Sequence, residues 1–303
     1  MKRLLRSFSH FAAFAGLLLG TMCAAQEGSL ENNPPKGITP EEIIQRFAAK
    51  EKEFKQARDQ YTYRQDITVK TLDGSTTTGE YHEVFDVLFD DKGHRMENVV
   101  FAPASSLEQG GLSLDSGDVQ DFRNRLPFVL TSDEIQEYNI IYVGQQTEDE
   151  LHCYVFDIAP KQIVGKKRYF QGRIWVDDHD LQIVKTYGQA VPEVRSTKKK
   201  GGDEHLYPKF TTWRQQIDGK YWFPVYTRAD DTLHFNLNDI HIREVVKYED
   251  YKRFGSSVKI LYQGQEIPKG DQKDQKAPPD QQNPPPQTPD QKKPDAAPNP
   301  PQK

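Results

Sequence analysis

Between Tyr61 and Tyr251 the sequence alternates apolar and polar residues, and many of the apolar ones are aromatic. Side chains of a β-strand point to opposite faces in turn, so this period of two predicts half-buried strands. We predict strands at residues 61–69, 80–90, 99–101, 138–146, 151–158, 167–177, 181–189, 209–217, 221–229 and 237–248. A meander of about ten strands twists too strongly to remain flat, so the expected fold is mainly β (α+β), a curved antiparallel half-barrel.

Turn residues separate several of the predicted strands. Asp73-Gly74 and Asp218-Gly219 are typical of hairpin turns, and so is the polar run Asp-Asp-His-Asp at 177–180. That run is the densest polar cluster of the chain, but its place between two apolar strands favours a turn over a metal site. Strands that follow each other in sequence are therefore expected to be antiparallel neighbours.

A helix start precedes the first strand. Thr39 can cap the helix, Pro40 suits its first turn and Glu42 can complete a capping box. Apolar residues then recur at helical spacing, whereas the charged run at 50–53 is expected mostly on the solvent side. We predict that the helix from Pro40 lies on one face of the sheet, and that short helices near 118–126 and 132–138 help it to cover the open side.

Several predicted strands carry apolar residues on both faces. Ile174 opposes Trp175, and Phe223 opposes Trp222, whereas an antiparallel sheet commonly exposes one face to water. The extra apolar residues imply either a filled core on both faces or an enclosed cavity for an apolar ligand. For the cavity, the predicted lining residues are Phe85, Val87, Phe89, Phe101, Phe156, Ile174, Trp175 and Trp222.

Residues 1–25 have the composition of a secretory signal peptide. Three basic residues precede an apolar stretch that ends in small residues, with cleavage expected after Ala25. Residues 26–38 are then a linker, and the mature protein is expected in the periplasm. The alternative is a lipid anchor on Cys23, although the three residues before it fit a lipobox poorly.

Charge and hydropathy limit the partners of the mature chain. The formal charge of −5 becomes −8 when the three basic residues of the signal peptide leave, which argues against nucleic acid. Beyond the signal peptide no apolar stretch is long enough to span a bilayer, so we expect peripheral membrane contact at most.

The carboxyl-terminal part has a different composition from the rest. Residues 264–303 hold 11 of the 20 prolines, in a background of Gln, Lys and Asp with few apolar residues. Such a segment cannot bury enough apolar surface to fold. We therefore predict a folded domain at 39–262 and a disordered tail at 263–303.

Recognisable catalytic motifs are missing from the sequence. It contains no Gly-x-Ser-x-Gly elbow, phosphate-binding loop or dinucleotide fingerprint, and no pair of histidines at the spacing of a zinc-binding helix. We predict no catalytic residue, no metal site and no cofactor, and thus a protein that is not an enzyme. A secreted hydrolase with residues scattered over several strands is a less favoured alternative.

Three segments resemble the LolA/LolB-like family of periplasmic lipoprotein carriers and receptors, which sort lipoproteins to the outer membrane. They are 151–161 (LHCYVFDIAPK), 172–185 (GRIWVDDHDLQIVK) and 217–226 (IDGKYWFPVY), and their order and spacing match the family as well. The resemblance covers roughly residues 39–251. It implies an incomplete barrel with helices in its open side and an apolar cavity for the acyl chains of lipoproteins.

The function that this resemblance implies is non-enzymatic. The protein is expected to bind lipoprotein acyl chains or another lipid, as a monomer, in transport to or sorting at the outer membrane, and to meet an outer-membrane or inner-membrane protein partner. The alternative is an RseB-like sensor or protein-interaction module of the cell envelope. Whether Arg64 corresponds to the arginine that holds helices and barrel together in the carriers is left open by the resemblance.

Overall fold

The computed structural model describes residues 27–90, 94–114, 119, 123, 128–165, 167–192, 194–195, 204–205, 207–235 and 237–254. These residues belong to one compact unit, Met1–Phe254. The predicted signal peptide, the predicted disordered tail and all but two residues of the predicted helix at 118–126 lie outside the described residues.

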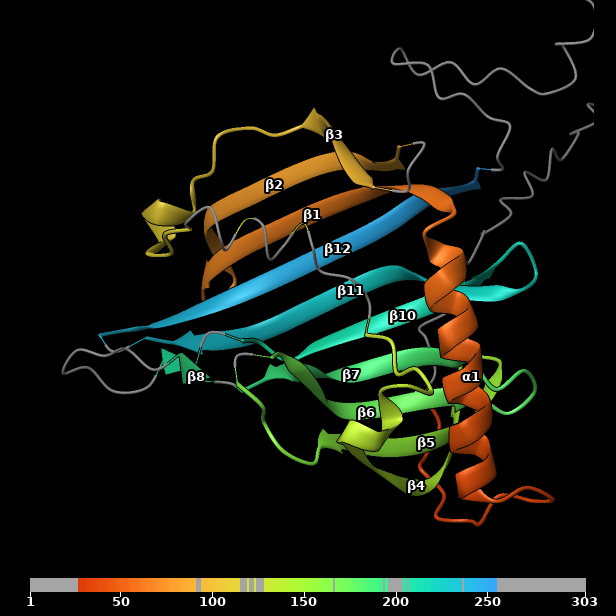
Figure 1. The fold of residues 1–303 in the computed structure, drawn as a ribbon. Helices are drawn as coiled ribbons and strands as arrows, with labels where there is room; N and C mark the ends of the chain where they lie inside the picture. Colours follow the sequence, from red (N-terminus) through yellow and green to blue (C-terminus); the bar gives the residue numbers. More distant parts are fainter. Residues whose placement is uncertain are drawn as a thin grey trace, which may run out of the picture. The chain divides into compact units, whose positions relative to one another are not determined.

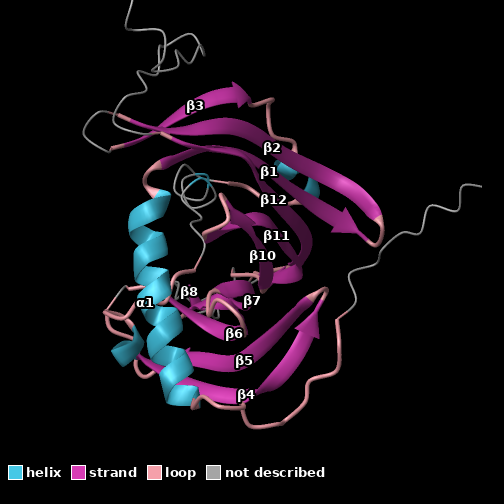
Figure 2. Ribbon diagram, turned by 90° about the vertical axis from the view of Figure 1, so that its right-hand side faces the viewer, coloured by secondary structure: helices cyan, strands magenta, loops and turns pink. Residues whose placement is uncertain are grey.

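The described residues form one antiparallel sheet (Figure 1). Its main path runs β3-β2-β1-β12-β11-β10-β7-β6-β5-β4, with the two short strands β8 and β9 beside it. The strands are β1 (Tyr61–Asp73), β2 (Thr76–Phe89), β3 (Arg95–Phe101), β4 (Tyr138–Glu148), β5 (Leu151–Pro160), β6 (Tyr169–Asp177), β7 (Ile183–Val191), β8 (Val194–Arg195), β9 (Glu204–His205), β10 (Phe210–Ile217), β11 (Tyr221–His234) and β12 (Asp239–Arg253). The sheet curls without closing (Figure 2), which confirms the predicted half-barrel.

The strand order differs from a simple meander in one respect. Strands β3 and β4 follow each other in sequence but form the two opposite edges of the sheet. The sheet is continuous because β1 pairs with β12, from Tyr61 opposite Arg253 to Leu72 opposite His241. This long pairing adds the first three strands to the end of the later meander, which local turn signals cannot reveal.

Edge strand β4 is partly covered by the segment that precedes the helix. The backbone N–H groups of Gly28 and Glu31 donate to the carbonyl oxygens of Thr147 and Gln145, each at 2.8 Å. The Gln145 N–H donates in return to the Glu31 carbonyl oxygen, also at 2.8 Å. The part of β4 near its carboxyl end is therefore not a free edge.

Two glycines allow neighbouring strands β6 and β7 to approach each other closely. Gly172 of β6 lies opposite Gly188 of β7. A Cβ atom on Gly172 would collide with the backbone oxygen of Tyr187, and one on Gly188 with that of Gln171. Glycine inside a strand is typical of such close approach of another backbone.

Helix α1 (Pro40–Arg58) begins as the sequence predicts. The Thr39 Oγ1 atom accepts a hydrogen bond from the Glu42 N–H at 3.2 Å, and proline occupies the first turn. The buried face includes Ile43, Phe47 and Phe54. Of the predicted short helix at 132–138 only a 3₁₀ turn, η2 (Ile135–Glu137), is formed.

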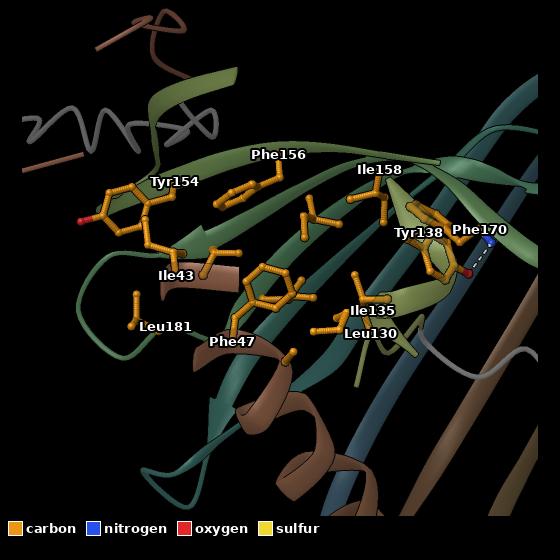
Figure 3. Packing of buried hydrophobic residues seen from close by; sticks show 14 of the residues in the cluster. Ile43, Phe47, Leu130, Ile135, Tyr138, Tyr154, Phe156, Ile158, Phe170 and Leu181 are labelled. Atoms are coloured by element: carbon orange, nitrogen blue, oxygen red, sulfur yellow. Dashed lines mark hydrogen bonds between the residues drawn. The ribbon is translucent and has the colours of Figure 1, made fainter. Parts of the chain in front are cut away.

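Apolar residues on the helix-covered face form two large clusters. The first lies between α1 and strands β4 to β7, where Phe47 of the helix faces Phe156 of β5 (Figure 3). The second lies on β1, β2, β11 and β12 and includes Leu107 of the 3₁₀ turn η1 (Leu107–Gly110). The helix therefore covers one part of the sheet, and the segment around η1 covers another.

The close approach of β6 and β7 at Gly188 can be tested by substitution. In a Gly188→Ala variant the added methyl group would displace backbone at the β6–β7 contact, so the free energy of unfolding should fall by about 1–3 kcal/mol. Urea denaturation measures this difference. Gln171→Ala, an exposed change on the neighbouring strand, is the control and should alter stability by less than about 0.5 kcal/mol. Equal stability of Gly188→Ala and the unaltered protein would contradict the proposed need for close approach.

Candidate functional site

An aromatic cavity lies beside the second cluster, where the last turns of α1 meet the sheet. Its volume is about 200 Å³, and its aromatic lining consists of Phe54, Tyr63, Phe89, Phe223, Tyr248 and Tyr251. These residues come from α1, β1, β2, β11 and β12. The cavity is thus built from elements far apart in sequence.

Ring contacts hold the walls of this cavity in place. The Phe223 ring lies 5.1 Å from Phe54, 4.6 Å from Tyr61 and 4.7 Å from Tyr251, measured between centroids. Tyr63 stacks on Tyr251 at 5.2 Å. Edge-to-face and offset contacts of this kind stabilise aromatic clusters beyond the area that they bury.

Most polar groups in the lining have partners. The Tyr251 hydroxyl donates to the Pro224 carbonyl oxygen at 2.7 Å. Burial raises the pKa of Tyr63 and, strongly, that of Tyr251, so both phenols are neutral near pH 7. The Arg58 guanidinium lies 3.6 Å from the Asp59 carboxylate, and Arg95 pairs with Glu97. What the cavity offers a ligand is therefore mainly apolar surface.

A buried ion pair fixes α1 to the sheet beside the cavity. Glu51 of α1 and Arg214 of β10 have side chains that are each 1% exposed. Arg214 donates from Nη1 to Glu51 Oε1 at 2.8 Å and from Nη2 to Oε2 at 3.3 Å, and also donates to the Phe128 carbonyl oxygen. Its guanidinium carbon lies 5.2 Å from the centroid of Phe54, a cavity wall.

The sequence interpretation of the helix was wrong for Glu51. The charged run at 50–53 was expected mostly in solvent, but Glu51 lies on the buried face of α1. Its spacing of four from Phe47 and three from Phe54 was a usable signal. Burial raises the pKa of Glu51, because the loss of hydration outweighs the opposing effect of Arg214. Arg64, by contrast, is partly exposed and pairs with Asp86 on the neighbouring strand at 2.8 Å.

The eight predicted lining residues do not share one surface. Only Phe89 lines the aromatic cavity. Phe85 and Val87 lie in the second cluster, Phe156 and Ile174 lie in the first beneath α1, and Trp175 and Trp222 belong to a cluster on the opposite face. Phe101, on edge strand β3, is 48% exposed. The period-two pattern of the sequence predicts which face of its strand each residue occupies. The curvature of the sheet decides which of these faces meet.

The polar run at 177–180 serves as a turn. The Asp177 carboxylate accepts from the backbone N–H groups of His179 and Asp180, at 3.2 and 2.9 Å. Asp180 accepts from the Gln182 N–H at 3.1 Å and from the Trp222 indole. Within the part of the chain that the structure describes, no three His, Cys, Asp or Glu side chains are grouped to hold a metal ion.

No helix among the described residues has the length and apolar character needed to cross a membrane. No protein-family model matches the sequence, and neither does any curated protein.

Solved structures give matches to the fold at low similarity. A DUF1329 family protein from Desulfovibrio piger is 12% identical, with a TM-score of 0.31, over 67% of this chain and 90% of the other. A LolA superfamily protein from Nitrosomonas europaea is 13% identical, with a TM-score of 0.28, over 67% and 93%. A domain from Vibrio parahaemolyticus described as an outer-membrane lipoprotein-sorting protein is 12% identical, with a TM-score of 0.29, over 67% and 90%. The matches thus include the family that the sequence segments resemble, at similarities too low to argue function.

The buried ion pair predicts a pH-dependent loss of stability. Arg214→Met leaves Glu51 buried without its partner, which should cost about 3–5 kcal/mol of unfolding free energy at pH 7.5. Burial already raises the folded pKa of Glu51 above its ordinary value of 4.5, and removal of Arg214 raises it further. A raised pKa means that folding favours the protonated form, so the loss should shrink as the pH falls towards 5.

Urea denaturation of Arg214→Met at the two pH values measures this dependence. Lys52→Met removes an exposed pair with Asp133 and should change stability by less than about 1 kcal/mol at either pH. The double variant Glu51→Leu/Arg214→Met should regain part of the loss, since it leaves no buried charge. A loss in Arg214→Met that is the same at both pH values would rule out an ionised Glu51 as its cause.

Proposed function

We propose that this protein is a non-enzymatic periplasmic binding protein for acyl chains of lipoproteins or other lipids, acting in transport to or sorting at the outer membrane. The observation that supports this proposal is the aromatic cavity between α1 and the curved sheet. Its lining is mainly apolar, and it lies between the second cluster and a small separate cluster formed by Phe54, Tyr61 and Phe223. Apolar pockets at such junctions are the usual place for small apolar ligands.

The cavity volume limits what it holds in the closed state. Its volume of about 200 Å³ exceeds that of an engineered core cavity of about 150 Å³ that binds benzene. It suits the end of an acyl chain, and each methylene group buried there contributes about 0.8 kcal/mol. A complete chain requires a larger opening, and movement of α1 would provide it because Phe54 of this helix forms one wall.

The chemistry of the lining favours binding over hydrolysis. A nucleophile or general base near pH 7 needs a pKa tuned towards that pH, whereas burial moves the pKa of Tyr63 and Tyr251 upward, away from it. The charged lining residues, Arg58, Asp59 and Arg95, are engaged in ion pairs. As a monomeric carrier, the protein would take its lipid from one membrane-protein partner or deliver it to another.

The proposal predicts lipid on the protein and a cavity-dependent affinity. Native mass spectrometry of gently purified protein should show bound acyl chains, and a dansyl-labelled undecanoic acid should bind the delipidated protein with increased fluorescence. Phe89→Asp places a charge in the apolar lining and should weaken this binding by about tenfold or more.

Phe101→Asp is the matched control. Phe101 is an exposed aromatic residue on neighbouring strand β3 and does not line the cavity, so its substitution should leave affinity unchanged. Thermal unfolding of both variants separates lost binding from lost folding. Folded, unaltered protein that carries no lipid and does not bind the probe would refute the carrier function and favour the sensor alternative, and turnover of ester substrates would favour a hydrolase.

A further inference from the structure

A second and larger hollow lies on the face of the sheet opposite α1. It is a groove of about 1050 Å³ that crosses β4, β5, β6, β7 and β10. Trp175, Tyr187 and Trp213 lie along it. The acyl-chain function uses the other face of the sheet and leaves this groove without a role.

The floor of the groove presents side chains, and few of its backbone N–H and C=O groups are free to bind a ligand. Strands β5, β6, β7 and β10 pair with one another through this region, for example Arg173 with Asp157 and Tyr187 with Thr211. An extended peptide is recognised mainly by backbone hydrogen bonds at a sheet edge. Because the backbone groups here are already engaged in the ladders, the groove is poorly suited to a peptide and must recognise its ligand through side chains.

Aromatic rings and unpaired polar groups both line this groove. Tyr187 is 45% exposed, and the Trp213 ring is half-buried beside it. Among the described residues, the Tyr187 hydroxyl and the amides of Asn139 and Gln171 have no hydrogen-bond partner, and Asn139 and Gln171 are exposed. They are therefore available to a polar ligand that also has an apolar face.

The charges of the groove are nearly balanced. Arg173 donates two hydrogen bonds to the Asp157 carboxylate, at 2.7 and 3.0 Å. Lys185 lies 2.7 Å from Glu148 and 3.5 Å from Glu27, with its ammonium 4.6 Å from the centroid of Trp175. These pairs leave no strong net field, which argues against a highly charged ligand.

We propose that this groove binds a saccharide. Sugar rings carry C–H faces that pack on aromatic rings, and their adjacent hydroxyl groups act as donors and acceptors at once. Tyr187 and Trp213 supply the rings. Adjacent sugar hydroxyl groups require planar side-chain groups that both donate and accept hydrogen bonds. Such groups are supplied by Asn139, Gln171 and the Arg173–Asp157 pair. The volume is at the upper end of the usual range for ligand sites, large enough for an oligosaccharide.

A printed array of bacterial and other defined oligosaccharides, without lipid, tests the proposal on the mature full-length protein. The tightest glycan is then titrated into the protein and followed by tryptophan fluorescence. Tyr187→Ala should weaken binding by about tenfold or more, whereas Tyr187→Phe keeps the ring and should weaken it by less than about threefold. Both changes are at an exposed position, so the fold should persist. Phe101→Ala, on a strand outside the groove, should have no effect.

Three results would each overturn the proposal. They are failure of folded protein to bind any glycan of the array, glycan binding that Tyr187→Ala leaves unchanged, and preference for a peptide library, screened in parallel with the array, with loss of peptide binding in Tyr187→Ala. If Phe89→Asp loses binding of the acyl probe but still binds the glycan, the two sites act independently.

Discussion

The buried pair between Glu51 and Arg214 is the constraint on which the arrangement of helix and sheet depends. Two opposite charges that are almost completely removed from water must stay together, because either one alone carries a large desolvation cost. The pair holds α1 against β10 at one position, and that position sets where Phe54 lies. One wall of the aromatic cavity therefore depends on this pair.

Much of the fold was predictable because strand and turn signals are local. The alternation that begins at Tyr61 and the Asp-Gly turns identify individual strands and hairpins, and the cap at Thr39 identifies the helix start. The pairing of β1 with β12 was not predictable in this way. It joins residues almost two hundred positions apart in sequence, and no local pattern distinguishes that partner from others.

The candidate sites were less predictable than the fold for a related reason. A cavity depends on which faces meet after the sheet curls, and a local pattern of residues does not contain that information. Period-two alternation gave Phe85 and Phe89 the same face, yet only Phe89 reaches the cavity. The groove on the opposite face escaped prediction because polar residues such as Gln171 and Asn139 look like ordinary solvent-exposed strand positions.

The segment at Gly28 and Glu31 makes the two ends of the sheet unequal. It occupies hydrogen-bonding positions along part of β4, whereas no described strand pairs with the outer side of β3. An unpaired strand edge is where another strand can add to a sheet. The amino-terminal segment thus shortens the stretch of β4 that is open to such an addition.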